Sequence, residues 1–367
     1  MVKTPIIKGF GGLKIIMAEP KTYHEQTKIN YTLRLRKIQK TLPPFAKDFF
    51  RAIEPTSSVR TRINYAYDIR VFFNFLIENN PVYRHYSLDQ FTIADLDRLE
   101  AVDIEEYQEY LKVYQKGDEM ITNDEKGLAR KMSALRTFYG YYYKHQLIEK
   151  NPTLLVDMPK LHDKAIIRLE PDEVASLLDH VESCGNQLTG QAKLYYEKTK
   201  MRDLAILTLL LGTGIRVSEC VGLDILDVDF KNNSLKVTRK GGNEMILYFG
   251  EEVEKALKNY LSTERKAMTP MAGHEKALFL SIQRKRMGVQ SMENMVKKYA
   301  RQVTPNKKIT PHKLRSTYGT TLYKETGDIY LVADVLGHKD VNTTKKHYAA
   351  IDEDRRRQAA SVVKLRE

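Results

Sequence analysis

The sequence is poor in the features that build disulfide-stapled, zinc-bound or membrane-spanning proteins. Its 367 residues include two cysteines, Cys184 and Cys220, with no CxxC motif and no Cys/His cluster, so neither a disulfide framework nor a zinc site is indicated. No apolar run approaches the ~20 residues of a membrane-spanning helix. The N-terminus lacks the pattern of a cleaved signal peptide. These absences favour a protein of the reducing cytoplasm.

Basic residues are in excess. Lys and Arg number 60 against 47 Asp and Glu, which gives a net charge of +13. A polyanion such as nucleic acid is therefore the first partner to expect. Hydrophobic residues at 42% and charged residues at 29% are typical of a folded chain. At roughly 150 residues per domain the length predicts two or three domains.

The first 50 residues predict a basic N-terminal arm. They hold ten Lys/Arg against three Asp/Glu, with glycines and a proline early. An arm that contacts DNA and an ordinary solvated tail both fit this composition. Within it, residues 27–40 predict a short basic helix that ends before Pro43 and Pro44.

Residues 51–150 predict an all-helical domain without a strand. Ser57 and Ser58 are candidate N-caps for a helix that ends at Pro81. Its apolar residues recur at helical spacing, namely Ile69, Phe72, Phe73 and Leu76. Two further helices are expected at residues 95–114 and 128–148.

The third of these helices combines an apolar stripe with basic residues. Met132, Leu135, Tyr139 and Tyr142 form the stripe. Residues 139–143 either stack on bases or belong to the core, and aromatic residues at helical spacing favour the core. The basic residues predict contacts with a phosphate backbone. With two from the first helix, the expected DNA-binding set is Arg60, Arg62, Arg130, Lys131, Arg136 and Lys144.

A linker and a second domain follow. Residues 151–164 contain Pro152 and Pro159 without periodicity, which predicts a linker. The second domain, residues 165–351, begins with a helix start at Glu170-Pro171 and includes an apolar run at residues 204–211. Two β-like runs at residues 234–238 and 245–249 flank a glycine turn and predict a hairpin. Helices continue from residue 251, and a tail spans residues 352–367.

Three clusters in this second domain carry residues suited to phosphoryl transfer. Arg216 follows two glycines at the start of a helix, where it either holds a phosphate or pairs with Glu219. His312 and Arg315 lie three apart on one helix face. The third cluster is the sequence LGH at residues 336–338, followed ten positions later by a tyrosine.

Together these residues supply the groups needed for a metal-free reaction at a phosphodiester. Arg216 and Arg315 would neutralise charge on the non-bridging oxygens. His312 would serve as a base, and the turn lysine, Lys240, would protonate the leaving 5′-oxygen. A tyrosine nucleophile forms a phosphotyrosyl bond close in energy to the phosphodiester, so strands can be rejoined without a cofactor. No Asp/Glu cluster with metal-ligand spacing accompanies the arginines.

The sequence resembles the tyrosine recombinases, or phage-type integrases. The resemblance rests on motifs in family order across residues 165–350: TGIRVSE around Arg216, the hairpin Lys240, HKLR at His312 and Arg315, LGH at His338, and Tyr348. It implies a multidomain α and α+β protein, in which a helical core-binding domain precedes a mixed α+β catalytic domain in a C-shaped clamp.

The resemblance also implies residue roles. Arg216, His312 and Arg315 would hold the scissile phosphate, Lys240 would act as general acid, and Glu219 would support the site. His338 would orient the phosphate and Tyr348 would attack it. In the family the tyrosine usually comes nine positions after this histidine, whereas Tyr348 comes ten positions after His338, and the residue nine positions after it is His347. The nucleophile assignment therefore has a rival.

The function implied is site-specific cutting and rejoining of DNA through a 3′-phosphotyrosyl intermediate, which moves or resolves a mobile element. The partner implied is double-stranded DNA with specific core sites. Four copies of the chain would assemble on it, with the tail of residues 352–367 docked onto a neighbour. The sequence leaves open whether accessory DNA-bending proteins take part. A solvated terminal helix is the alternative for the tail. The alternative functions are a type IB topoisomerase and a non-catalytic sequence-specific DNA-binding regulator.

Overall fold

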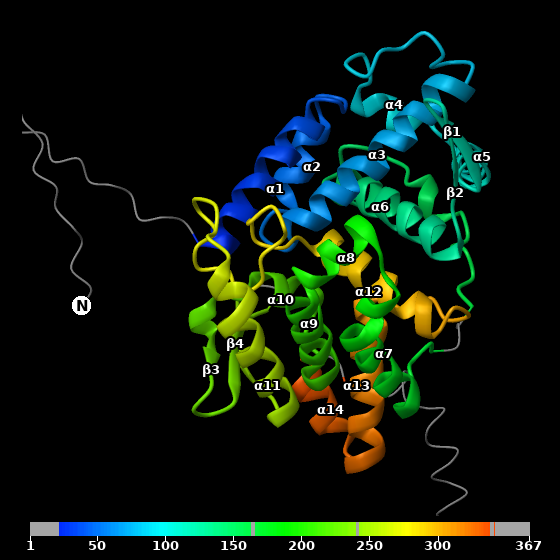
Figure 1. The fold of residues 1–367 in the computed structure, drawn as a ribbon. Coiled ribbons are helices and arrows are strands. Elements are labelled where there is room, and N and C mark those ends of the chain that lie inside the picture. Colours follow the sequence, from blue (N-terminus) through cyan, green and yellow to red (C-terminus); the bar gives the residue numbers. More distant parts are fainter. Residues whose placement is uncertain (1–21, 163–165, 240–241, 338–340, 342–367) are drawn as a thin grey trace, which may run out of the picture. The chain divides into compact units, whose positions relative to one another are not determined.

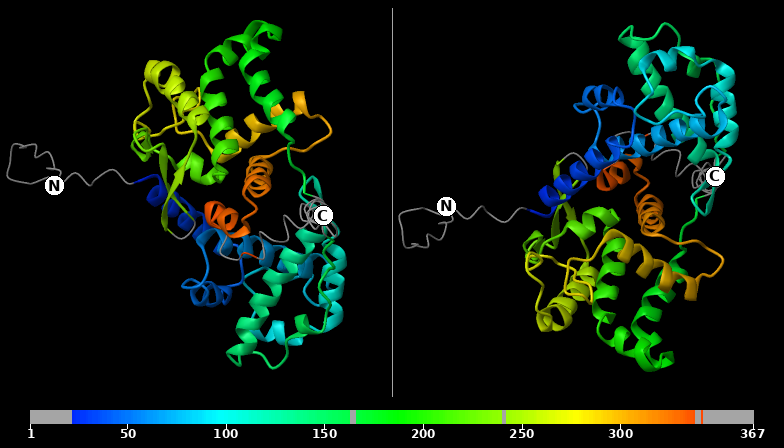
Figure 2. Two further views of the ribbon diagram at one scale, coloured as in Figure 1. Left: turned by 90° about the horizontal axis from the view of Figure 1, so that it is seen from below. Right: turned by 90° about the horizontal axis from the view of Figure 1, so that it is seen from above.

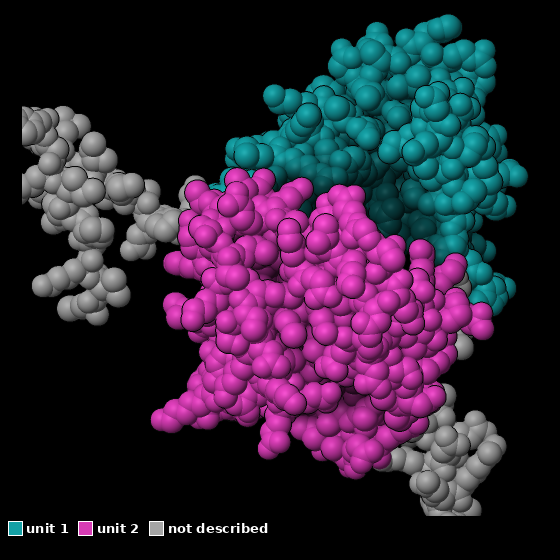
Figure 3. All heavy atoms as spheres, viewed as in Figure 1, with its two compact units in different colours: residues 1–164 teal, residues 165–367 magenta. Residues whose placement is uncertain are grey.

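The computed structural model describes residues 22–162, 166–239, 242–337 and 341. The chain divides into two units, residues 1–164 and 165–367, which are coloured separately in Figure 3. Unit 1 is helical with one small hairpin, and unit 2 combines helices with a three-stranded sheet (Figure 1). This composition agrees with the predicted fold class.

Unit 1 is organised around α3 (Val59–Asn79), the helix predicted from its apolar spacing. The Ser58 side chain accepts a hydrogen bond from the backbone N–H of Thr61 at 3.1 Å and so caps the helix. Phe72 and Phe73 are fully buried and meet edge to face, with ring centroids 5.5 Å apart. α3 packs against α1 (Tyr23–Gln39), α5 (Ala101–Tyr110) and α6 (Glu125–Lys144).

Much of the predicted basic arm belongs to this core. α1 buries Leu35 and Ile38, and α2 (Ala46–Ala52) buries Phe49 and Phe50. The Thr22 side chain and Glu25 form a capping box at the start of α1. The helix predicted at residues 27–40 lies largely within α1, and residues 23–50 pack into unit 1, while residues 1–21 lie outside the described part.

The expected absence of strands in unit 1 is wrong. The helix predicted at residues 95–114 is two short helices, α4 (Ile93–Arg98) and α5, because Glu100 and Asp103 form a capping box that starts a new helix. A hairpin then pairs β1 (Val113–Lys116) with β2 (Glu119–Thr122). Its two-residue turn uses Gly117, whose φ of +60° suits glycine.

α6 confirms the core interpretation of its stripe. Tyr139 and Tyr142 are fully buried, and their hydroxyls donate to the carbonyls of Leu96 at 3.3 Å and Phe45 at 3.0 Å. Tyr143 is half exposed. The chain then passes through a 3₁₀ turn, η1 (Pro152–Leu154), which packs against α5 and α6, so the first part of the predicted linker packs on unit 1.

Unit 2 is built around the apolar helix α9 (Lys200–Thr213). Its residues 205–207, 209 and 210 are fully buried, and it packs against α7 (Pro171–Ser183), α11 (Glu251–Tyr260) and α13 (Pro311–Thr326). α8 (Gly190–Glu197) precedes it and α10 (Val217–Gly222) follows it. Figure 2 shows two further views of this arrangement.

The sheet of unit 2 is antiparallel with the order β3-β4-β5. Its strands are β3 (Val228–Asp229), β4 (Ser234–Thr238) and β5 (Glu244–Tyr248). The predicted hairpin is β4–β5, in which Ser234 faces Tyr248 and Thr238 faces Glu244. Short 3₁₀ turns lie at η2 (Cys184–Gln187) and η3 (Ile225–Asp227), and α11 continues into a π-helical turn, η4 (Leu261–Arg265).

The last described helices are α12 (Val289–Val303), α13 and α14 (Ile329–Leu336). α14 rests on α13 through an apolar cluster in which Tyr323 from α13 meets Val332 and Leu336 from α14. Gly337 ends α14 with a φ of +61°, a left-handed conformation that favours glycine. This contact fixes the C-terminal end of α14, which is central to the site.

Candidate active site

Arg216 is positioned by a tight helix-to-helix turn. α9 ends at Gly214, whose φ is +61°, and α10 begins directly after Arg216. A Cβ on Gly214 would lie 2.5 Å from Cδ1 of Tyr318, so close packing as well as backbone conformation requires glycine here. The buried side chain of Ile215 fixes the turn between them.

Glu219 holds Arg216 by two hydrogen bonds. Its Oε2 accepts from the backbone N–H of Arg216 at 3.1 Å, and its Oε1 accepts from Nη1 at 2.8 Å. Arg216 Nη2 also donates to the carbonyl of Gly337 at 3.1 Å. The Arg216 side chain is 35% exposed, while that of Glu219 is 5% exposed. The pairing expected as an alternative to phosphate binding is therefore present, and it leaves part of the guanidinium open to solvent.

Arg315 comes from α13 and is buried. Its Nη1 donates to the carbonyl of Gly214 at 2.5 Å, and its Nη2 donates to the carbonyl of Leu336. Arg315 therefore joins the end of α9 to the end of α14. His312 lies one turn earlier on α13 and is exposed, after Pro311 at the first position of the helix.

Three arginines meet at the C-terminal end of α14. The carbonyls of three consecutive residues, Val335, Leu336 and Gly337, each accept from a different guanidinium. The donors are Arg239, Arg315 and Arg216 respectively. The last carbonyls of a helix have no partner within the helix and carry partial negative charge, which explains why they attract cations. Of these three arginines, sequence analysis selected two and missed Arg239.

The remaining predicted catalytic residues, Lys240, His338 and Tyr348, lie outside the described residues, as does His347. Lys240 and His338 each follow a described residue in the chain, and those two described residues are in close contact. Arg239 precedes Lys240, Gly337 precedes His338, and a Cβ on Gly337 would lie 1.2 Å from Nη1 of Arg239. The side chain of Arg239 thus reaches the residue before His338.

The six predicted DNA-binding residues divide into two groups. Arg60, Arg130 and Lys144 are exposed, although Arg60 donates to the Tyr31 hydroxyl at 2.7 Å and Arg130 pairs with the buried Asp68. The other three have their side chains engaged with their own unit. Arg62 pairs with Glu54 at 3.0 Å, Lys131 donates to Asn123 Oδ1 at 2.5 Å, and Arg136 donates to the carbonyls of Thr153 and Val156.

Burial explains the arrangement around Lys131. Burial raises the pKa of Asp68, and the charges of Arg130 and Lys131 oppose that rise. Burial lowers the pKa of Lys131, and Asp68 opposes that change. A buried carboxylate needs cations beside it, so these two basic residues stabilise the interior of unit 1.

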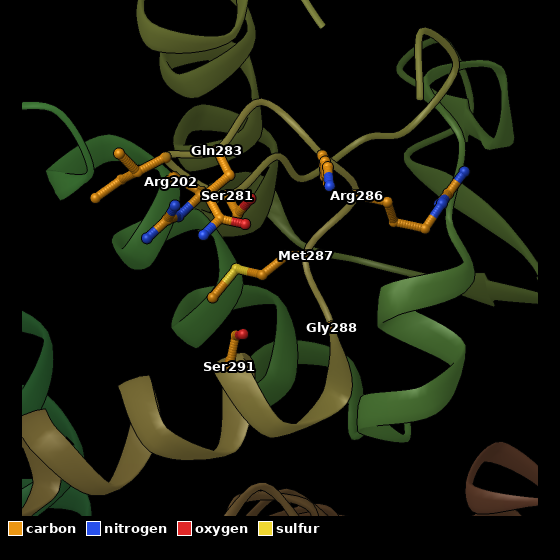
Figure 4. Close-up of a pocket in the computed structure, with 9 residues that line it drawn as sticks. Arg202, Ser281, Gln283, Arg286, Met287, Gly288 and Ser291 are labelled. Carbon is orange, nitrogen blue, oxygen red and sulfur yellow. The ribbon is translucent and has the colours of Figure 1, made fainter. Parts of the chain in front are cut away.

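A cavity of about 400 Å³ lies elsewhere in unit 2 (Figure 4). It is lined by residues that include Arg202, Ser281, Met287 and Ser291, and by none of the predicted catalytic residues that the structure describes. Arg202 is engaged with Asp203 at 2.6 Å and with the carbonyl of Leu280 at 2.9 Å. The cavity is therefore separate from the arginine cluster.

Over the described part of the chain, no group of three His, Cys, Asp or Glu residues is arranged to hold a metal ion. Both cysteines are free and buried. No described helix has both the length and the apolar character needed to cross a membrane.

Comparison with known proteins places this chain in a family. Residues 167–355 match the phage integrase family. Tyrosine recombinase XerC of Caldanaerobacter subterraneus subsp. tengcongensis is 33% identical over 87% of this chain and 86% of its own. Tyrosine recombinase XerS of Streptococcus thermophilus is 28% identical over 88% of this chain and 96% of its own. The chain belongs to the phage integrase family and is a tyrosine-type site-specific recombinase.

Solved structures give the same fold. The site-specific recombinase XerH, bound to its palindromic difH substrate, is similar with a TM-score of 0.64 and 17% identity over 94% of this chain and 91% of its own. The Tn1549 transposon integrase in complex with transposon right-end DNA has a TM-score of 0.60 and 21% identity over 86% of this chain and 98% of its own. These relatives lend no support to the topoisomerase or regulator alternatives.

Proposed function

We propose that this recombinase cuts double-stranded DNA at specific core sites and rejoins the strands through a 3′-phosphotyrosyl bond to Tyr348. The observation that carries the proposal is the meeting of Arg216 and Arg315 at the end of α14, directly before His338. Two guanidiniums held by backbone carbonyls are preorganised to receive the charge that develops on a phosphodiester during attack.

The proposed chemistry assigns a proton to each step. The Tyr348 oxygen attacks phosphorus, its proton passes to His312, and the bond from phosphorus to the 5′-oxygen breaks while Lys240 protonates that oxygen. Arg216, Arg315 and His338 hold the non-bridging oxygens, and Glu219 fixes Arg216. Reversal with a second 5′-hydroxyl rejoins the strand, so no nucleotide cofactor is needed.

In the proposed assembly, four copies act on two duplexes at the nucleoid and move or resolve a mobile element. The segment of residues 352–367 docks onto a neighbouring copy, and accessory DNA-bending proteins assist. The family relationship supports this arrangement, and sedimentation of the protein with its core site tests the number of copies.

The decisive experiment identifies the DNA that becomes covalently attached. Fragments of the host genome with a nick close to each end are incubated with the protein, denatured, captured through the protein and sequenced. We expect one core sequence, attached through a 3′-phosphate, with attachment unaffected by EDTA and absent in Tyr348→Phe. Attachment to unrelated sequences with relaxation of supercoils would favour a topoisomerase, and specific binding without attachment would favour a regulator.

A further inference from the structure

Arg239 stands at the start of the β4–β5 turn, where its backbone is fixed. Its N–H donates to the carbonyl of Asn243 at 2.8 Å, and its own carbonyl accepts from the N–H of Gly242 at 3.0 Å. Gly242 has a φ of +87°, which suits glycine and allows the turn to close. The direction in which the Arg239 side chain leaves the sheet is therefore set by the hairpin.

The side chain of Arg239 is anchored at one end only. Nη2 donates to the carbonyl of Val335 at 2.9 Å, and this is the one side-chain hydrogen bond that Arg239 makes with the described residues. Nε is buried and has no hydrogen-bond partner there. Buried polar groups are nearly always paired, so a guanidinium with unused donors in this position calls for an explanation.

The charge around Arg239 is incompletely balanced. Burial lowers the pKa of Arg239 below its ordinary value, and the charge of Arg216 acts in the same direction. Glu219 and Asp334 oppose this effect, but Glu219 is already bonded twice by Arg216. Within the described part of the chain Arg239 therefore has no carboxylate of its own, and a half-buried guanidinium gains stability when an anion binds to it.

The close approach to Gly337 shows where that anion would lie. Nη1 occupies the space that a Cβ on Gly337 would take, beside the carbonyl that accepts from Arg216. Arg239, Arg315 and Arg216 thus donate to three consecutive carbonyls, those of Val335, Leu336 and Gly337. These carbonyls directly precede His338, where the proposed function places the scissile phosphate.

We propose that Arg239 is a third phosphate-binding guanidinium of the active site, whose Nη1 donates to a non-bridging oxygen of the scissile phosphate. This inference rests on the proposed function. The rival explanation is a structural role alone, in which Arg239 only holds the end of α14 through Val335.

The test compares two substrates. In one, the scissile phosphate is an ordinary phosphodiester; in the other, a methyl group replaces a non-bridging oxygen and removes the negative charge. Cleavage by Arg239→Gln should be roughly tenfold to a hundredfold slower than wild type on the phosphodiester, as expected for loss of one hydrogen bond to a charged group. On the methylphosphonate the variant should approach the wild-type rate. Arg216→Ala is the reference and should show the same pattern.

An equal reduction of the cleavage rate on both substrates would overturn the inference, because a purely structural role does not depend on the charge of the phosphate. Arg239→Lys, which keeps the charge, should lie between wild type and Arg239→Gln on the phosphodiester. Arg301→Gln, an exposed arginine at the end of α12, is the matched control for lost charge and should cleave both substrates as wild type does. Thermal unfolding of each variant shows whether it is folded.

Failure of the inference and failure of the proposed function are distinguishable. If the wild-type protein attaches to no DNA, the proposed function is wrong. If the wild type attaches through Tyr348 while Arg239→Gln slows cleavage of both substrates by the same factor, only the role of Arg239 is wrong.

Discussion

Arg315 joins two helix ends, since its Nη1 donates to the carbonyl of Gly214 at 2.5 Å and its Nη2 donates to the carbonyl of Leu336. The end of α9 and the end of α14 are therefore held at a fixed separation by one buried side chain. Because Gly214 is two residues before Arg216, and Leu336 is two residues before His338, this bridge sets the spacing of the proposed phosphate site.

Glu219→Gln should weaken the site without removing a phosphate ligand. The change leaves a neutral side chain beside Arg216 and breaks a buried charge-assisted pair, which should cost about 1–3 kcal/mol in the free energy of unfolding. Covalent attachment to DNA should slow, because Arg216 loses its charged partner and one of the two acceptors that Glu219 provides. Urea unfolding and attachment rates measure the two effects.

Glu244→Gln is the matched control for that change. Glu244 pairs with Lys236 at 2.9 Å, and both side chains are more than half exposed. Its replacement should leave both unfolding and attachment as in the wild type. A similar loss from the two variants would contradict a special role for Glu219.

Gly337→Ala should be more damaging than alanine at another left-handed glycine. Gly337 and Gly190 have similar φ values of +61° and +55°, but a Cβ on Gly190 meets nothing within 4 Å, while one on Gly337 lies 1.2 Å from Arg239 Nη1. Backbone strain alone should cost roughly 1–2 kcal/mol at either position. Displacement of Arg239 should add to this only at Gly337 and should also slow DNA attachment. Equal unfolding temperatures for the two variants would refute the close contact.

Sequence patterns predicted the helices of this protein better than they predicted its polar contacts. The apolar spacing of Phe72, Phe73 and Leu76 identified α3 because one buried stripe is a local property of the chain. The β1–β2 hairpin was missed because its turn signal, Gly117-Asp118, is short and its strands have four residues each. Lys131 looked like a surface residue because the sequence does not show the buried Asp68 beside it.

The arrangement of the arginines was only partly predictable. Arg216 and Arg315 were selected from residue chemistry, and Glu219 was expected as the alternative partner of Arg216 and, from the resemblance, as a supporting residue. The acceptors at Val335, Leu336 and Gly337 are backbone carbonyls, which leave no mark in the sequence. Arg239 was therefore read as part of a turn, and its place beside Lys240 was the one signal that would have selected it.

The salt dependence of DNA binding should separate exposed from buried lysines on α6. Lys144 is exposed, so Lys144→Gln should reduce the slope of log K against log salt by about 0.9 if it contacts one phosphate. Lys131 is buried and bonded to Asn123, so Lys131→Met should destabilise unit 1 and leave the slope unchanged. Titrations between 50 and 200 mM salt measure the slopes, and an equal reduction by both variants would contradict the assignment.

Lys240→Ala should slow cleavage of ordinary DNA but recover on a substrate whose leaving 5′-oxygen is replaced by sulfur. A thiolate leaves without protonation, so the general acid is no longer needed. Arg216→Ala should not recover on this substrate, because the charge on the non-bridging oxygens persists. Single-turnover cleavage rates on the two substrates provide the measurement, and a Lys240→Ala variant without recovery would assign Lys240 another role.

The identity of the nucleophile is open to a chemical test, because His347 and Tyr348 are adjacent in the chain and both suit attack on phosphorus. We expect Tyr348. A tyrosine with an ordinary pKa of about 10 must lose its proton during attack, and the proposed site supplies His312 to accept it and two guanidiniums to stabilise the charge. A histidine nucleophile would form a phosphoramidate, whose P–N bond breaks readily in acid, whereas an aryl phosphate ester persists. The attached DNA should therefore survive mild acid, vanish in Tyr348→Phe and remain in His347→Ala. An acid-labile bond, or one that still forms in Tyr348→Phe, would transfer the role to His347 and shift the alignment of the final segment by one residue.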